Sequence, residues 1–306
     1  MKKLNKLEPI YKDYLWGGNK LRENYNKTDT DLYPIAESWE LSTHIDGISK
    51  IGNLSLSDFI KNNPSCLGTK CKDTDIPILI KYIDAKDKIS IQVHPDDTYA
   101  RIHENDNGKT ELWYILEADE NAYIYLGTNK TLSKDEFKAS ITSNTVTSYL
   151  NKIYVKQGDI YFIEPGTIHS LGEGCLVAEI QEKSNITYRV YDYDRRDKYG
   201  HLRDLHIQKA LDVVNLTKHT SNARNKDTHL LEDCKYFKVY LYESSKDTTI
   251  HISDSSFAVV MLIQGFAKLT ANDESLEVIQ GNSIFLPADN YDVTISGNYK
   301  FLLVTL

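Results

Sequence analysis

Four residues of the kinds that bind divalent metal ions lie on three strand-like segments of the chain. Gln92 and His94 belong to the segment Ile-Ser-Ile-Gln-Val-His-Pro at 89–95, Glu111 follows an Asn-Gly turn, and His169 follows a Pro-Gly turn. Because side chains alternate between the two faces of a strand, Gln92 and His94 point to the same side, about 7 Å apart along the strand. A glutamate between apolar and aromatic neighbours, such as Glu111, is costly to bury unless it is paired or binds a metal.

Each segment has an ordinary explanation by itself: a polar strand surface, an edge glutamate, and a histidine in a turn. Together the three segments supply amide, imidazole and carboxylate ligands and no thiolate, a set that suits Zn²⁺ or a similar ion with room left for water or substrate. The order of the segments resembles the double motif of a cupin jelly roll. The sequence therefore predicts an open catalytic metal site in a β-barrel.

The elements that must position these residues are mainly short strands. Runs rich in Ile, Val and Tyr, separated by Gly, Pro and Asn-Gly turns, predict strands over 89–94, 111–116, 122–126, 160–163, 176–181 and 186–191. Serine caps, a Ser-x-x-Glu capping pattern and apolar spacing predict helices over 55–62, 96–104, 133–140 and 205–214. We expect an all-β fold of two jelly-roll (cupin) barrels, the first with the metal site and a small helical part.

The polar stretch 217–227 has the composition of a linker, and it predicts a domain boundary near residue 225. Residues 1–225 would form the catalytic metal-binding cupin domain with its helical additions, and residues 226–306 a metal-free cupin-like domain. Strands are predicted over 236–242, 257–263, 266–270, 276–279, 284–286 and 301–306.

The C-terminal region repeats the pattern of the first domain without its ligands. The segment 281–287 is similar to 158–165, but four residues beyond Pro287 stands Tyr291, where the first domain has His169 four beyond Pro165. The histidines of this region are His229 and His251. We expect neither to bind metal.

The composition excludes several classes of protein. With 41% hydrophobic and 26% charged residues in 306, the chain can build a core and is not disordered. Its longest apolar run, 257–263, is too short for a membrane span, and the amino terminus lacks the apolar stretch of a signal peptide. A net charge of −8 argues against nucleic acid as a partner. Four cysteines without C-x-x-C spacing indicate reduced thiols, and we expect a cytoplasmic protein.

At these motifs the sequence resembles the type I mannose-6-phosphate isomerases (phosphomannose isomerases) of the cupin superfamily, specifically their short bacterial form. Several independent motifs occur in the family's order over nearly the whole chain. They lie at 8–18, 35–42, 77–85, 92–95, 108–113, 166–169 and 179–189. The segment between Glu111 and His169 is too short for the large helical insertion of the longer members, and the approach to Arg189 matches those members only loosely.

The resemblance implies one Zn²⁺ per chain and an aldose–ketose isomerase that interconverts mannose 6-phosphate and fructose 6-phosphate through a cis-enediol. By the resemblance, the zinc ligands are Gln92, His94, Glu111 and His169. Arg189, 20 residues beyond His169, matches the family's catalytic arginine, and Lys109 and Glu179 match positions that line its active site.

The base that moves the proton between C1 and C2 stays open among Glu179, Lys109 and a metal-bound hydroxide. If the strands 176–181 and 186–191 pair, Arg189 and Glu179 approach each other. For the substrate phosphate, the cations at hand besides Arg189 and Lys109 are Lys86, Lys88, Arg195 and Arg196.

Two other functions fit the same motifs. One is a non-catalytic sugar-binding or regulatory cupin related to the isomerases, which would bind sugar without turnover. The other is a metal cupin of a different class, such as a dioxygenase, although Gln92 stands where such a site would have a further histidine. The partners that we expect are the two sugar phosphates, with no nucleic acid and no membrane, in a monomer or a homodimer.

Overall fold

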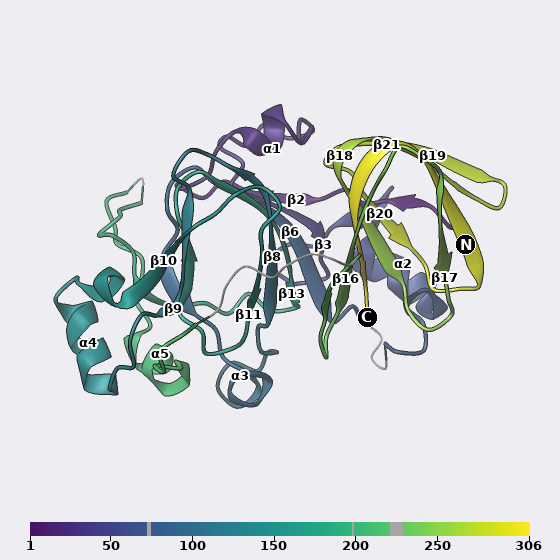
Figure 1. The fold of residues 1–306 in the computed structure, drawn as a ribbon. Coiled ribbons are helices and arrows are strands. Elements are labelled where there is room, and N and C mark those ends of the chain that lie inside the picture. The colour runs from purple at the N-terminus through teal and green to yellow at the C-terminus, as the bar shows by residue number, and fades with distance from the viewer. Residues whose placement is uncertain (72–74, 198, 221–228) are drawn as a thin grey trace. The chain divides into compact units, whose positions relative to one another are not determined.

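The computed structural model describes residues 1–71, 75–197, 199–220 and 229–306, and these residues form two compact units (Figure 1). Unit 1 contains residues 1–12, 20–82 and 229–306, and unit 2 contains residues 13–19 and 83–220. Most of the first 82 residues therefore belong to the same unit as the C-terminal region. The boundary predicted near residue 225 lies outside the described residues and stays a prediction.

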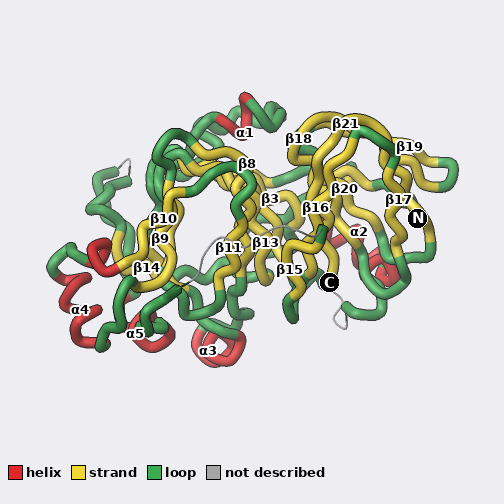
Figure 2. The backbone as a smooth tube through the Cα atoms, viewed as in Figure 1, coloured by secondary structure: helices red, strands yellow, loops and turns green. Residues whose placement is uncertain are grey.

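Strands predominate in both units (Figure 2), which confirms the expected mainly β fold with a few helices. The arrangement as two complete barrels stays a prediction. None of the helices in the described part of the chain combines the length and the apolar character that a membrane crossing requires.

Unit 2 contains the strands that carry the predicted ligands. One sheet has the order β10–β9–β12–β7–β14, and β11, β8 and β13 are consecutive neighbours in another. The bounds are β7 Ile91–Val93, β8 Glu111–Ala118, β9 Tyr123–Thr128, β10 Leu150–Tyr154, β11 Ile160–Ile163, β12 His169–Leu171, β13 Cys175–Glu182 and β14 Tyr188–Tyr191. The predicted strands are present, with ends shifted by a few residues.

Three helices of unit 2 pack behind the sheet of β7 and β14. They are α3 Asp97–His103, α4 Lys134–Thr142 and α5 Ile207–Val213, and a 3₁₀ turn, Val146–Tyr149, precedes β10. Ile91 and Val93 of β7 join a buried cluster with Phe137 of α4 and Leu211 of α5. Since alternate residues of a strand face opposite ways, this apolar packing turns Gln92 to the other face of the sheet.

The helices begin where their caps predict. The Ser133 side chain accepts from the Glu136 amide, and the Glu136 carboxylate accepts from the Ser133 amide, which completes a capping box on α4. The Asp96 side chain caps α3 by accepting from the Tyr99 amide. These local hydrogen bonds need no tertiary contact, so the starts of the helices could be read from the sequence.

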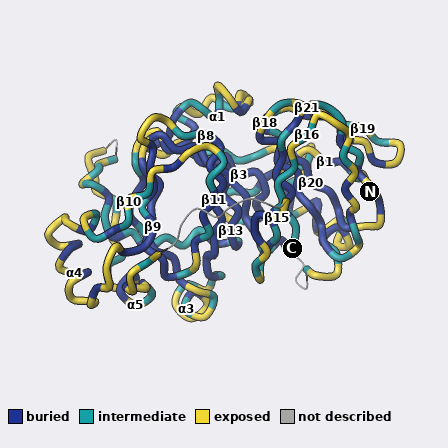
Figure 3. Tube along the Cα trace, in the orientation of Figure 1, coloured by how far each residue is buried: buried dark blue, intermediate teal, exposed yellow. Residues whose placement is uncertain are grey.

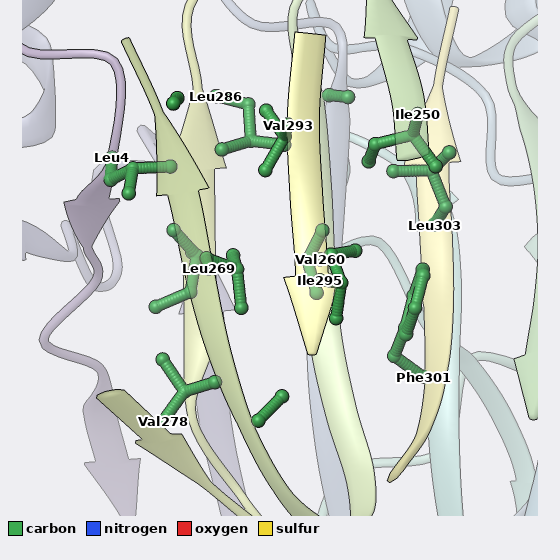
Figure 4. Packing of buried hydrophobic residues seen from close by; sticks show 14 of the residues in the cluster. Leu4, Ile250, Val260, Leu269, Val278, Leu286, Val293, Ile295, Phe301 and Leu303 are labelled. Carbon is green, nitrogen blue, oxygen red and sulfur yellow. The ribbon is translucent and has the colours of Figure 1, made fainter. Parts of the chain in front are cut away.

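Unit 1 is built around a sheet with the order β1–β20–β18–β21–β16–β15, to which β17 and β19 add beside β21 and β18. Its core packs the inner faces of these strands (Figure 4). The bounds are β1 Asn5–Lys6, β15 Leu230–Asp233, β16 Lys238–Ser244, β17 Thr248–Ile252, β18 Ala258–Ala271, β19 Glu274–Ile279, β20 Ser283–Leu286 and β21 Tyr291–Thr305.

The rest of unit 1 comes from the N-terminal third of the chain. It consists of β2 Ile10–Lys12, α1 Lys20–Glu23, β3 Glu37–Leu41, β4 Lys50–Ile51, β5 Leu54–Ser55, α2 Leu56–Asn62, the 3₁₀ turn Pro64–Leu67 and β6 Ile78–Ala85, whose last three residues belong to unit 2. The whole of β6 is buried (Figure 3).

One pair of predicted strands, 257–263 and 266–270, is a single strand, β18. The register with β21 shifts between Leu262 and Gln264, and the Gln-Gly pair that follows stays paired with β21 and forms no turn. Gly265 adopts a φ of +80°, and a Cβ there would lie 2.1 Å from Asn298 O. Only glycine fits this position, so the strand bends and continues.

Candidate metal centre and active site

The structure brings three of the four predicted ligands together in unit 2. His94 follows β7, Glu111 begins β8 and His169 begins β12. One ligand atom from each residue lies within 4.8 Å of the others. His94 Nε2 is 3.3 Å from Glu111 Oε1, and His169 Nε2 is 3.4 Å from Glu111 Oε2. Among the described residues, this is the one group of His, Cys, Asp and Glu side chains with such an arrangement.

Hydrogen bonds fix which nitrogen of each imidazole faces the cluster. His94 Nδ1 lies 2.7 Å from Ile186 O, and His169 Nδ1 lies 2.8 Å from Thr167 O. A carbonyl oxygen only accepts, so each Nδ1 carries the proton and each Nε2 presents a lone pair. Both Nε2 atoms are buried without a hydrogen-bond partner. Orphaned acceptors that converge in this way are the arrangement that a metal-binding histidine requires.

The protonation states also suit a cation. Burial, with Lys109 close by, lowers the pKa of His94 to about 3, and burial lowers the pKa of His169. Both imidazoles are therefore neutral at neutral pH. Burial alone would oppose a charged Glu111, but Lys109 and the two histidines hold the pKa of this carboxyl well below its usual range. The cluster thus offers two neutral nitrogens and one carboxylate, a set that fits Zn²⁺.

The register of the sheet places Gln92 and Arg189 beside the cluster. Gln92 of β7 is directly opposite His169 of β12 on one side and Arg189 of β14 on the other. Residues directly opposite in an antiparallel pair point to the same face. The half-buried Arg189 side chain donates from Nε to Ser90 Oγ at 3.3 Å and from Nη1 to Asp204 O at 3.0 Å.

Lys109, two residues before β8, and Glu179 of β13 adjoin the cluster from the side of the other sheet. Lys109 Nζ lies 2.9 Å from Glu111 Oε1, and both side chains are almost completely buried. Glu179 is directly opposite Trp113, whose indole Nε1 donates to its carboxylate at 2.9 Å. The same indole ring meets the His169 ring edge-on, with 5.4 Å between centroids. The buried Glu179 is therefore linked to the metal ligands through one aromatic side chain.

The strands over 176–181 and 186–191, whose pairing the sequence left open, do not pair with each other. β13 pairs with β8, whereas β14 pairs with β7 in a different sheet. Strand partners depend on the path of the whole chain, and two runs close in sequence offered no information on this point. Arg189 and Glu179 reach the cluster from separate sheets and not as neighbours on one.

Arginines gather around one aspartate close to Arg189. Arg203 Nε and Arg195 Nη2 each donate to the Asp192 carboxylate at 2.7 Å. Burial, followed by the charge of Arg203, lowers the pKa of Arg189, which still remains a cation at neutral pH. Asp87 lies 3.6 Å from Arg195 Nη1, and the charge of Asp204 also acts on Arg189. The three arginines of this group therefore face three carboxylates, and their guanidinium N–H groups are the donors that could bind a phosphate.

The other predicted cations are less well placed. Lys86 is exposed, and the Lys88 ammonium lies 4.4 Å from the centroid of the Tyr193 ring. Arg196 is exposed and donates to Gly200 O at 2.6 Å. The sequence did not single out Arg203, because its role depends on Asp192, which is 11 residues away.

Gln181 is a further residue that the sequence interpretation missed. It is completely buried on β13, directly opposite Glu111. Its Nε2 donates to Glu182 O at 2.8 Å and to Ser184 O at 2.6 Å, while its Oε1 has no hydrogen-bond partner. The signal in the sequence was its alternation with Glu179, which places the two side chains on one face.

In unit 1 the corresponding positions have other roles. Tyr291, at the place that corresponds to His169, is buried, and its hydroxyl donates to Pro287 O at 3.1 Å. His251 pairs with Asp292 at 2.8 Å on the surface, and His229 stacks on Tyr242. In the described part of the chain, these residues contribute to no metal-binding group.

Comparison with known proteins assigns both parts of the chain. Residues 4–130 match the phosphomannose isomerase type I catalytic domain, and residues 226–306 match the mannose-6-phosphate isomerase cupin domain. The chain is 35% identical to GmuF of Bacillus subtilis strain 168, described as a probable mannose-6-phosphate isomerase, over 97% of each chain. It is 33% identical to the mannose-6-phosphate isomerase of Streptococcus mutans over 89% of each.

A solved structure has the same fold over the full length. The crystal structure of mannose 6-phosphate isomerase from Bacillus subtilis superposes with a TM-score of 0.89, at 31% identity and complete coverage of both chains. A mannosephosphate isomerase-like structure from Archaeoglobus fulgidus superposes with a TM-score of 0.82 at 19% identity, which supports the fold alone.

Proposed function

The chain belongs to the type I mannose-6-phosphate isomerase family, and from this premise we propose that it is a zinc-dependent aldose–ketose isomerase that interconverts mannose 6-phosphate and fructose 6-phosphate through a cis-enediol. The observation that carries the proposal is the convergence of His94 Nε2, His169 Nε2 and the Glu111 carboxylate beside the buried Lys109 ammonium. Sequence similarity explains the class of reaction, and this geometry supports a complete site for it.

The residues that would hold the metal are His94, Glu111 and His169, with Gln92 as the fourth ligand. They fit the ion because their nitrogens are neutral and aimed inward and the one carboxylate is charged. Zn²⁺ bound there would act as a Lewis acid toward the oxygens of the open-chain sugar. We propose one ion per chain, in the domain 1–225, and no ion in the domain 226–306.

Arg189 would stabilise the negative charge that develops on oxygen in the enediol. It is opposite Gln92 on the adjacent strand, and Ser90 and Asp204 hold its guanidinium in place. A guanidinium keeps its charge at every working pH and does not need to reorganise during the reaction. Its half-buried position strengthens the interaction relative to water.

Lys109 and Glu179 are the two side chains beside the ligands that can hold or accept the proton that moves between C2 and C1. Lys109 approaches from the side of Glu111, and Glu179 from the side of His169 through Trp113. Both are buried, so the proton is transferred away from bulk water. Arg195 and Arg203, which both donate to Asp192, would offer guanidinium donors to the substrate phosphate.

The test is a coupled assay on the purified, zinc-loaded chain. We expect fructose 6-phosphate from mannose 6-phosphate, loss of turnover after chelation, and recovery when Zn²⁺ is returned. In D₂O, deuterium at C1 of the fructose 6-phosphate formed would support the enediol, because a direct hydride shift introduces none. Binding of mannose 6-phosphate without any product would instead support a non-catalytic sugar-binding cupin.

The setting of the enzyme follows from the same features. Cysteines 66, 71, 175 and 234 form no disulfide, which fits the reducing cytoplasm. We propose sugar phosphates as the partners, with no role for nucleic acid or membranes, and a monomer or homodimer as the working state.

A further inference from the structure

The segment that carries Lys109 is held by three consecutive main-chain amides, each with its own acceptor. Gly108 N donates to Asp97 Oδ1 at 3.1 Å, Lys109 N donates to Pro95 O at 3.1 Å, and Thr110 N donates to Glu182 Oε1 at 2.9 Å. Two of these acceptors are carboxylate oxygens from elements that the chain reaches 11 residues earlier and 72 residues later. The position of Lys109 therefore depends on two acidic side chains that do not themselves face the metal ligands.

The fit of this segment is tight. A Cβ on Gly108 would lie 2.4 Å from Asp97 N, so the backbone packs directly against the start of α3. On the other side, Glu182 N donates to Thr110 O at 3.0 Å. Glu182 thus contacts Thr110 through both its backbone and its side chain, on the face of the β8–β13 ladder opposite Glu111.

The two carboxyl groups also meet each other. Glu182 is 2% exposed, and its side chain is hydrogen-bonded to that of Asp97. Two carboxyl groups can share a hydrogen bond only when one of them carries a proton. Arg101 Nη2 lies 3.5 Å from Asp97 Oδ2, which favours charge on Asp97 and the proton on Glu182.

Other charged residues adjoin the pair. On α3 and at its two ends they are Arg101, Asp96, which caps the helix, and Glu104, which pairs with Lys209. Elsewhere they are Asp106, which accepts from Ser184, Lys183 directly after β13, and Lys109, whose ammonium lies beside Glu111. Burial raises the pKa of Glu182 to about 7. The hydrogen bonds to Thr110 oppose this rise, and the nearby Asp97 adds to it. The proton is thus retained into the neutral range, in agreement with the geometry.

We propose that Glu182 in its protonated form, hydrogen-bonded to Asp97, is a positioning residue for Lys109. The inference rests on the proposed isomerase function, because that function makes the location of the Lys109 ammonium matter. Loss of the shared proton places two negative charges side by side under the segment 108–110. The amide anchors of Gly108 and Thr110 then separate, and Lys109 leaves its position beside Glu111.

Two substitutions separate this role from a purely structural one. Glu182→Gln keeps an oxygen that accepts from Thr110 N and an amide that donates to Asp97, and it holds this state at every pH. Glu182→Ala removes both. Glu120→Gln, in the exposed turn between β8 and β9, is the matched control. The readouts are kcat and KM as functions of pH, with zinc content measured on each preparation.

We expect the kcat of the wild type to fall as the pH rises above about 7, while Glu182→Gln keeps its activity to higher pH and the control follows the wild type. We expect Glu182→Ala to lower kcat roughly ten- to hundredfold, with a much smaller change in KM and unchanged zinc. A wild-type kcat in Glu182→Ala, or a pH profile of Glu182→Gln that coincides with that of the wild type, would overturn the inference.

A spectroscopic measurement tests the pair without any assay of turnover. Infrared difference spectra of the zinc-loaded chain between pH 6 and pH 9 should contain a carboxylic-acid carbonyl band that is absent in Glu182→Gln. The absence of this band from the wild type would refute the shared proton. If the wild type had the band but made no fructose 6-phosphate, the proposed function would fail and the carboxyl pair would stand.

Discussion

Arg189→Ala is the substitution with the largest effect expected from the geometry of the site. The side chain is half-buried, and its guanidinium is fixed by Ser90 Oγ at 3.3 Å and Asp204 O at 3.0 Å. Alanine removes the cation and leaves the three ligands of the metal cluster untouched, since Arg189 contacts none of them in the described hydrogen bonds. The substitution should therefore affect the chemical step and not the binding of zinc.

The magnitude follows from the role of the cation. Removing one preorganised group that stabilises a developing oxyanion costs about 10²- to 10³-fold in kcat, or about 2.7–4 kcal/mol. The half-buried position of Arg189 supports a value in this range. Arg189→Lys retains the charge but loses the fork that donates to both Ser90 and Asp204, so we expect an intermediate rate.

The assay couples fructose 6-phosphate formation to NADPH, with zinc content and the melting temperature measured on the same preparations. Arg22→Ala is the matched control, because Arg22 also donates to main-chain carbonyls, those of Thr30 and Leu32, but lies on α1 in unit 1. A normal kcat in zinc-loaded Arg189→Ala would refute the reasoning. Equal losses in Arg189→Ala and Arg22→Ala would show that the effect comes from folding.

The other predictions concern metal binding, the stability of the protein at acidic pH and one helix cap. Glu111→Gln removes the one charged ligand, and metal analysis should find the zinc lost. The pKa of His94 is about 3 in the folded chain and near 6.5 in the unfolded chain, so between these pH values the unfolded chain binds more protons. The free energy of unfolding should therefore fall as the pH drops below about 6.5, by up to about 1.4 kcal/mol per pH unit for this residue. Urea titrations of the metal-free protein measure this. Ser133→Ala should destabilise the chain by about 1 kcal/mol in urea and leave kcat unchanged. Replacement of both His229 and His251 should leave the zinc content unchanged, and a loss of metal would contradict a metal-free C-terminal domain.

Local chemistry made part of the structure predictable. The capping box of Ser133 and Glu136 and the cap at Asp96 act within one helical turn, so their sequence signatures gave the helix starts to within a residue. The strand face that carries Gln92 followed from alternation alone, since Ile91 and Val93 must be buried on the other side.

In the candidate site, the sequence predicted only those residues whose side-chain type by itself indicates metal binding. His94, Glu111 and His169 were identified from residue chemistry and motif order, and the structure brings their ligand atoms together. Gln181 and Glu182 were missed because their role arises from the pairing of β13 with β8, which aligns residues about 70 positions apart. No local sequence pattern predicts the register between β13 and β8.

Two features of the strands could not be read from the sequence for the same physical reason. The sequence left open whether β13 pairs with β14, and each pairs with a different partner. The single strand β18 was divided in two because Gly265 also has the signature of a turn residue. In both cases the outcome depends on hydrogen bonds to strands far away in sequence, and these decide between alternatives that are locally equal.

The most direct test of the account is NMR observation of mannose 6-phosphate incubated with the zinc-loaded chain. We expect conversion to an equilibrium mixture with fructose 6-phosphate, and no conversion with the Glu111→Gln variant at equal concentration. Unchanged mannose 6-phosphate with the zinc-loaded wild type, or equal conversion by both proteins, would contradict it.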